Sequence, residues 1–225
     1  EEALTNVIRR ALIADERIIA FTAGHGEGEL TGVDGDGFSI FNGRLKELNL
    51  EIETGVRLAG DALDHISLLT ILGPDTALST EAVDAVRQYL QRGGDLLLLV
   101  DPATSSGLED LLRDEYSIDI GDNFIVDLSG LGQLFGADVS VPVVINYADH
   151  PITERMTRGT MSFFPWARSV AALTSGDGVI ELLHTDRNAW GESDLGVVHG
   201  TSQEVDFDAE SDNPGPLSLA VAATV

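Results

Sequence analysis

One short stretch of the chain carries side chains that could bind a ligand or transfer a proton. His25 and Glu27 alternate with glycines at positions 24, 26 and 28, directly after the apolar run Ile18–Phe21. A short, fully apolar run is typical of a strand buried on both faces, and open α/β sheets place their ligand sites at the carboxyl ends of such strands. The sequence therefore predicts a ligand-binding loop formed by Gly24, His25, Gly26 and Glu27.

Two further polar residues follow predicted strands and could face the same pocket. Asp101 comes directly after one apolar run, and His150 comes shortly after another. Both are therefore added to the candidate ligand site. A metal site could be formed by His25, Asp101, Asp149 and His150, but no H-x-x-x-H or similar local spacing supports it. We expect neither a metal nor a cofactor.

The same residues argue against nucleotide binding and covalent catalysis. Position 29 is Glu where a dinucleotide fingerprint has its third glycine, and a carboxylate-lined loop would repel a pyrophosphate. The chain has no cysteine, and Ser105 and Ser106 do not sit in a G-x-S-x-G elbow. No catalytic residue is therefore expected. A simpler interpretation stays open, in which His25 and Glu27 only hydrogen-bond the backbone of a tight turn.

Both tryptophans have arginine neighbours in the sequence. Trp166 precedes Arg168 by two positions, and Trp190 follows Arg187 by three. These residues could form an aromatic and cationic recognition patch, or they could be half-buried packing residues with a charged neighbour.

The composition describes a strongly acidic globular chain. Hydrophobic residues make up 43% of its 225 residues, and we expect one domain over residues 1–225. Asp and Glu number 38 against 13 Lys and Arg, which gives a formal net charge of −25. Such a field repels phosphate backbones and anionic lipid headgroups, so nucleic acid is not an expected partner. The acidic surface could serve solubility or adaptation to high salt.

Apolar runs and helical spacings alternate through residue 116. Strands are expected at 18–21, 50–53, 65–72 and 95–100, and helices at 2–16, 38–48, 80–92 and 108–116. Ser79 is a good N-cap, and Gly93-Gly94 would end the helix that it starts. The alternation predicts an α/β fold in which a parallel sheet carries helices on both faces. The acidic, glycine-rich segment 29–37 is expected to be exposed.

Residues 117–225 have a different texture, with little helical periodicity. Strands are expected at 118–120, 124–126, 141–147, 179–184, 196–199 and 217–225. We expect this half to be a strand- and loop-rich extension that continues the same sheet or covers its edge.

Several blocks of the sequence resemble one protein family. Phe21-Thr22-Ala23-Gly24-His25-Gly26-Glu27 resembles the strand–loop "LTGHGE" of the auxiliary component of uncharacterised ABC-type transport systems, the GldG-like gliding-motility family. Further blocks similar to that family occur in the same order along nearly the whole chain: the EEALTNVIRRAL segment, Leu72-Gly-Pro74 with Leu78-Ser79, Arg92-Gly-Gly94 to Asp101-Pro102, Val141-Pro-Val-Val144, Asp149-His-Pro-Ile-Thr153, Phe164-Pro165 with Ala167-Arg-Ser169, Trp190-Gly-Glu-Ser-Asp194 and Gly215-Pro-Leu217 with Leu219-Ala-Val-Ala222.

The resemblance implies a flavodoxin-like α/β fold, related to class I glutamine-amidotransferase-like domains and to an intraflagellar-transport subunit domain. It also implies a non-enzymatic interaction domain on the extracytoplasmic side, with ABC-transporter permease and ATPase subunits as partners. Both ends of the sequence look internal to a longer chain, so we expect transmembrane anchors outside it. In the catalytic relatives the nucleophile is a cysteine after a strand, and this chain has none. The alternative is a small-ligand-binding or degenerate hydrolase/amidotransferase-like domain with a pocket near His25.

Overall fold

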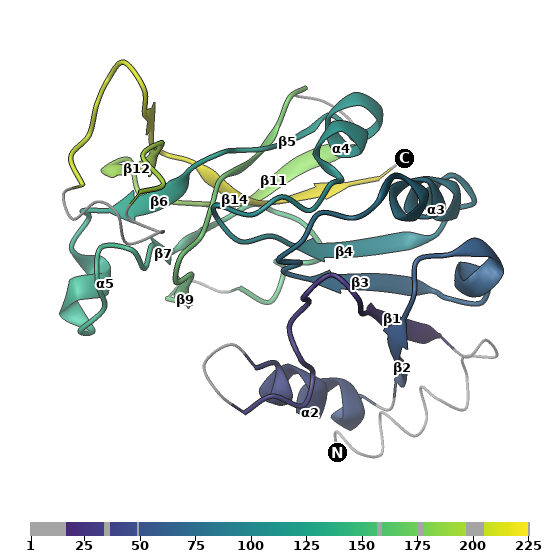
Figure 1. The fold of residues 1–225 in the computed structure, drawn as a ribbon. Helices are drawn as coiled ribbons and strands as arrows, with labels where there is room; N and C mark the ends of the chain where they lie inside the picture. Colours follow the sequence, from purple (N-terminus) through teal and green to yellow (C-terminus); the bar gives the residue numbers. More distant parts are fainter. Residues whose placement is uncertain are drawn as a thin grey trace. The chain divides into compact units, whose positions relative to one another are not determined.

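The computed structural model describes residues 17–33, 37–48, 50–156, 159–174, 178–196 and 205–224 (Figure 1). The chain divides into two compact units, Glu1–Val100 with Thr104–Leu108, and Asp101–Ala103 with Glu109–Val225. The predicted helix at 2–16 and most of the predicted strand at 196–199 lie outside the described residues. A single domain over the whole chain stays a prediction.

The first unit contains a four-stranded parallel sheet. Its strands are β1 (Ile18–Thr22), β2 (Glu51–Val56), β3 (Leu68–Leu72) and β4 (Asp95–Leu99), in the order β2-β1-β3-β4. The helical elements among its described residues are α2 (Ser39–Glu47), the 3-10 turn η1 (Gly60–Leu63) and α3 (Thr80–Gln91). The four strands and both α-helices were expected from the apolar spacing, and each is confirmed.

Both faces of the central strands are buried. Ile19 and Phe21 point to one face, where they form a core cluster with Leu45 of α2. Ala20 lies between them in the strand and points to the other face, beside its pairing partner Leu69 of β3. Both of these residues are 0% exposed. Burial on both faces explains why these strands appear in the sequence as continuous apolar runs.

The described residues of segment 29–37 are exposed or partly exposed as expected, apart from Leu30. Leu30 is 8% exposed and belongs to the same core cluster as Phe21. The backbone N–H of Phe38 donates to Glu29 O at 3.0 Å. One apolar side chain among acidic and glycine residues therefore anchors the described part of this segment.

Helix α3 begins and ends as the sequence predicts. Ser79 Oγ accepts a hydrogen bond from Ala82 N at 3.3 Å, and Gly93 after the helix has a φ of +87°. The hydroxyl of Tyr89 donates to Asp95 O at 3.0 Å, which ties the helix to the start of β4. A Cβ on Gly94 would lie 2.3 Å from the Tyr89 ring, so glycine is required for this close approach.

The second unit is built mainly from short antiparallel strands. These strands pair as β10-β5, β14-β11-β8, β13-β12-β6 and β7-β9. The bounds are α4 (Glu109–Tyr116), β5 (Ile118–Ile120), β6 (Phe124–Asp127), α5 (Leu131–Leu134), β7 (Val143–Val144), β8 (Asn146–Tyr147), β9 (Ser162–Phe163), β10 (Val170–Ala172), β11 (Val179–His184), β12 (Ala189–Glu192), β13 (Asn213–Pro214) and β14 (Ser218–Ala223).

The antiparallel pairing corrects one expectation about the second half. Within the described residues, none of its strands hydrogen-bonds to the parallel sheet, so the sheet is not extended. The predicted strands at 118–120, 124–126 and 179–184 are confirmed, and the run 141–147 is divided between β7 and β8. The structure is therefore a mixed α/β fold with one parallel sheet and several antiparallel sheets.

Candidate functional site

The glycine loop after β1 is tied to the ends of neighbouring strands. Gly28 N donates to Leu72 O at 2.8 Å, and Thr76 N donates to His25 O at 3.0 Å. Gly24 and Gly26 have φ values of +122° and +80°, a region that L side chains rarely adopt. The loop is thus held in one path across the carboxyl end of the sheet, as the position of its glycines predicts.

Glu27 is a buried carboxylate that holds the loop from inside. Its side chain is 3% exposed, and its Oε2 accepts a hydrogen bond from His25 N at 2.7 Å. Burial by itself raises the pKa of Glu27. The backbone N–H groups of His25 and Glu27, together with Thr22 and the His25 ring, lower this pKa by more than burial raises it. The net pKa lies below 4.5, so the carboxylate is ionised at neutral pH.

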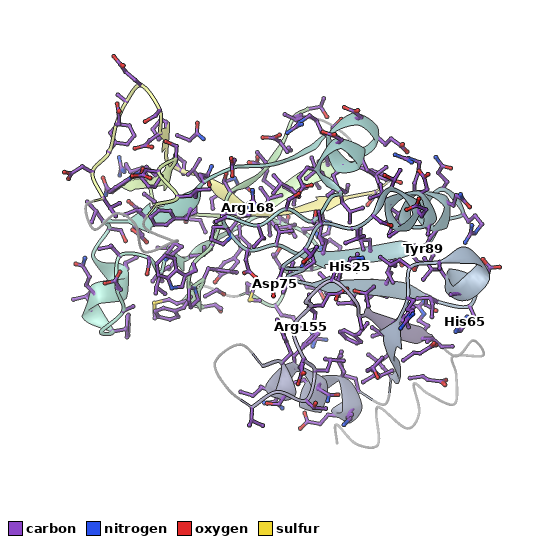
Figure 2. All side chains as sticks on the ribbon, viewed as in Figure 1. His25, His65, Asp75, Tyr89, Arg155 and Arg168 are labelled. Carbon is purple, nitrogen blue, oxygen red and sulfur yellow. The ribbon has the colours of Figure 1, made fainter. Side chains whose placement is uncertain are left out.

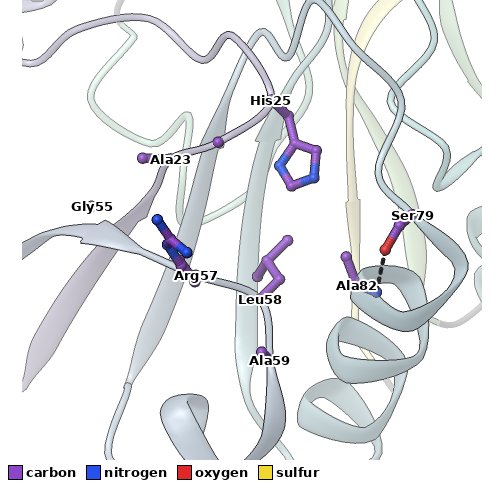
Figure 3. A pocket seen from close by; sticks show the side chains of 9 residues that line it. Ala23, His25, Gly55, Arg57, Leu58, Ala59, Ser79 and Ala82 are labelled. Atoms are coloured by element: carbon purple, nitrogen blue, oxygen red, sulfur yellow. Dashed lines mark hydrogen bonds between the residues drawn. The ribbon is translucent and has the colours of Figure 1, made fainter.

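The His25 imidazole lies between this carboxylate and solvent. Its Nδ1 is 3.5 Å from Glu27 Oε1, which is a close charge contact when the ring is protonated but is too long for a good hydrogen bond. Both of these atoms are buried and lack a hydrogen-bond partner among the described residues. The side chain is 21% exposed, and the ring points into an open pocket (Figure 3).

This pocket has a volume of about 550 Å³ and lies at the ends of β1 and β2, beside the start of α3. Its polar side chains are His25, Arg57 and Ser79. A β-bulge shapes one wall: Phe21 pairs with Thr54 but Thr22 pairs with Val56, and the intervening Gly55 has a φ of +75°. Bulges of this kind turn the chain at the edge of a sheet and re-aim nearby side chains.

Glu27 supplies a test of the loop. We expect Glu27→Ala to lower the free energy of unfolding at neutral pH by about 1–3 kcal/mol, because His25 N loses its buried acceptor. Glu27→Gln keeps an oxygen acceptor and should cost less. Because the folded pKa is depressed, the ionised carboxylate contributes stability fully above about pH 4.5, and this stability is lost as the pH falls through the folded pKa. Urea unfolding followed by circular dichroism at several pH values measures both effects.

The control for Glu27 is Glu51→Gln, the same charge change on an exposed position of β2. It should retain the acid sensitivity of the wild type, whereas Glu27→Gln should reduce it. Equal acid sensitivity in wild type and Glu27→Gln would contradict the role given to this carboxylate.

The candidate residues fall into two groups. Gly24, His25, Gly26 and Glu27 lie together in the first unit, whereas Asp101 and His150 belong to the second. His150 Nδ1 accepts a hydrogen bond from Ile152 N at 3.2 Å, and Asp101 O accepts one from Arg168 at 3.0 Å. A pocket that includes both groups stays a prediction.

Arg57 and Ser79 are pocket residues that sequence reasoning missed. The expected second strand ended at residue 53, so the bulge and the residues after it were not placed at the sheet edge. Ser79 was interpreted as an N-cap alone. The usable signal was Gly55, because a glycine within an alternating strand is typical of a bulge.

Other polar candidates have local structural roles. Ser106 is 1% exposed and its Oγ accepts from Leu108 N at 3.1 Å, while Ser105 Oγ accepts from Gly107 N at 3.3 Å. Both hydroxyls therefore take part in the turn before α4. Within the described residues, no group of three His, Cys, Asp or Glu side chains is placed to hold a metal ion.

Of the two interpretations of the tryptophan and arginine neighbours, the burial of Trp190 and Arg168 supports packing over a recognition patch. Trp190 is 6% exposed and donates from Nε1 to Glu192 at 3.2 Å, and Arg168 is 5% exposed (Figure 2). Trp166 is 44% exposed and packs on Phe124 with ring centroids 5.9 Å apart. Each sequence pair therefore has one buried member: Arg168 beside the exposed Trp166, and Trp190 near the exposed Arg187.

Comparisons with known proteins match almost the full length of the chain. Residues 16–225 match the family described as "ABC-type uncharacterized transport system". Among solved structures, the mmIFT52 N-terminal domain is similar with a TM-score of 0.58 and 17% identity, over 76% of this chain and 74% of that one. A thua-like protein from Bacteroides uniformis ATCC 8492 has a TM-score of 0.49 and 13% identity, over 90% and 77%. No curated protein matches the chain.

Proposed function

Because the chain belongs to the family of auxiliary components of ABC-type transport systems, we propose that it is a non-enzymatic interaction domain that supports transport or assembly of an export complex. Its partners are the permease and ATPase subunits of the transporter. In this proposal it is a GldG-like, gliding-motility-type component. The domain lies on the extracytoplasmic side and is anchored by transmembrane segments outside this sequence.

The observation that carries the proposal is the family match over residues 16–225. The match includes the glycine loop, the strand and helix starts of the first unit and the strand-rich second unit, so it concerns the whole arrangement and not one motif. The parallel order β2-β1-β3-β4 supports the finer proposal that the first unit is flavodoxin-like and related to glutamine-amidotransferase-like domains.

Two features support an interaction role over an enzymatic one. The chain contains no cysteine, so the thiol nucleophile of catalytic relatives with a similar fold has no counterpart. The hydroxyls of Ser105 and Ser106 accept hydrogen bonds from the backbone of their own turn.

Among the described residues, no helix has the length and apolar character needed to cross a membrane.

Affinity purification from native membranes tests the proposed partners. We expect a tagged full-length protein, cross-linked in cells, to recover an ABC permease or ATPase that an untagged strain does not yield. Because the extracytoplasmic side includes both the periplasm and the cell surface, protease is added to spheroplasts, whose outer membrane is opened. It should cleave the domain, and a cytoplasmic reporter should survive. Purification without any transporter subunit, or a domain protected until the spheroplasts are lysed, would contradict the proposal.

A further inference from the structure

The pocket beside His25 has a charge character unlike that of the rest of the chain. Asp and Glu make up 38 of the 225 residues, yet none of the nine residues that line the pocket is acidic. Arg57 and His25 supply the cationic and ionisable side chains instead (Figure 3). The chain as a whole repels anions, whereas a pocket with a guanidinium and no acidic lining residue disfavours an anion less.

Arg57 is available to a ligand. Other arginines of the first unit already pair with carboxylates: Arg44 with Glu47 and Arg92 with Asp64. The Arg57 side chain is exposed and, among the described residues, makes no hydrogen bond or ion pair. A guanidinium presents a planar pair of N–H donors that matches a carboxylate.

His25 is oriented so that a pocket ligand can reach one ring nitrogen. Nδ1 is the buried nitrogen, 3.5 Å from Glu27 Oε1, which leaves Nε2 for the pocket side. When it carries the proton, Nε2 can donate a hydrogen bond to an anion. Glu27 accepts from the backbone N–H of His25 and so fixes the loop at this residue. Glu27 thus acts as a positioning residue for His25.

The N-terminus of α3 does not serve as the anion anchor. Ala82 N already donates to Ser79 Oγ, and hydrogen bonds from the Glu81 backbone and Ser79 lower the pKa of the Glu81 carboxyl. Asp75 also lies nearby, since a Cβ on Gly26 would come within 2.8 Å of its side chain. With Glu27, Asp75 and Glu81 around the pocket, a dianion such as a phosphate monoester is disfavoured relative to a monoanion.

The remaining wall of the pocket is apolar. Leu58 and Ala82 are 7% and 4% exposed, and Ala23 and Ala59 complete this wall. A pocket of about 550 Å³ is within the size range of small-molecule sites. We propose that this pocket binds a small organic monocarboxylate, with the carboxylate on Arg57 and His25 and the apolar body against Leu58, Ala59 and Ala82.

Titration of the ¹⁵N-labelled 225-residue chain tests this site separately from any transporter partner. The probes are benzoate and hexanoate, with benzamide as a neutral analogue of benzoate and phenyl phosphate as a dianion. We expect both carboxylates to shift the amide signals of His25, Gly55 and Leu58 with dissociation constants on the order of 1 mM. Benzamide and phenyl phosphate should bind at least about tenfold more weakly.

Matched charge variants locate the anion. Arg57→Gln should weaken benzoate binding by about tenfold or more, because it removes a charge-assisted contact. Arg92→Gln removes the same charge at the opposite end of α3 and should leave binding unchanged. The proposal is overturned if the dissociation constants of both carboxylates are more than about tenfold higher than expected. It is also overturned if benzamide binds as tightly as benzoate, or if the two variants weaken benzoate binding equally. None of these outcomes bears on whether the domain contacts a transporter.

Discussion

Replacing Arg168 with alanine is expected to lower the free energy of unfolding of the second unit by about 2–5 kcal/mol. The Arg168 side chain is 5% exposed. Its Nε donates to Gly121 O at 2.7 Å and one Nη donates to Asp101 O at 3.0 Å. Alanine would leave two part-buried carbonyls without these donors. An unsatisfied acceptor costs up to about 1–3 kcal/mol, and the lost packing of the buried arginine side chain adds to this.

The electrostatic setting of Arg168 explains why this position suits arginine. Burial lowers the pKa of its guanidinium, whereas Asp122, Glu109 and Asp101 raise it, so the group remains charged near neutral pH. Arg168→Lys keeps the charge but offers a point donor in place of a planar fork. We therefore expect lysine to recover only part of the lost stability.

Tryptophan fluorescence during urea unfolding measures this effect, because both tryptophans, Trp166 and Trp190, belong to the second unit. Arg187→Ala is the matched control, since Arg187 is exposed in a turn of the same unit. The control should change the free energy of unfolding by less than about 0.5 kcal/mol. An Arg168→Ala variant as stable as this control would show that the two carbonyls find other donors.

The parallel sheet could be predicted because its signal is local. Residues 18–21 and 68–72 are short, mainly apolar runs, and burial on both faces requires this composition. Residues 96–99 are also a continuous apolar run, although Leu97 and Leu99 are 39% and 37% exposed. Ser79 and Gly93 mark the ends of α3 by their own backbone geometry. Each of these features depends on a few adjacent residues, so the sequence alone was sufficient.

The second unit was harder to predict because its strands depend on distant partners. Two of the four residues of strand β12 are a glycine and a glutamate, which do not indicate a buried strand. All four are nevertheless buried, because β12 pairs with β6 and β13. Strands β9 and β13 have two residues each, which is too short for any periodicity. Their register comes from contacts between residues that are far apart in the chain.

The candidate site could be predicted only in part, because some of its residues are placed by local sequence and others by strand pairing. Its glycine loop follows an apolar strand directly, so His25 and Glu27 could be placed at the sheet edge from local spacing. Arg57 reaches the pocket only because β2 bulges at Gly55, and the bulge is defined by its pairing with β1. A residue positioned by pairing between strands leaves little trace in one sequence.

A buried polar network in the second unit gives the last test. Asn123 Nδ2 donates to Ser169 Oγ at 2.9 Å, and Ser169 N donates to Asn123 Oδ1 at 3.1 Å. A Cβ on Gly121 would lie 2.1 Å from that Oγ and 2.6 Å from that Nδ2, far inside van der Waals contact. Gly121→Ala should therefore lower the free energy of unfolding by about 2–4 kcal/mol through overpacking and a broken hydrogen bond.

Ser169→Ala distinguishes steric overlap from other effects of changing Gly121. Alone, it should cost about 1–2 kcal/mol, because Asn123 Nδ2 loses its acceptor. Combined with Gly121→Ala, it removes the atom nearest to the new methyl group, so the double variant should be more stable than additivity predicts by about 1 kcal/mol. Arg187→Ala is again the control, because Arg187 is exposed in a turn of the unit that contains both tryptophans. Strictly additive costs in tryptophan-detected urea unfolding would show that the overlap at Ser169 is not what excludes a side chain at position 121.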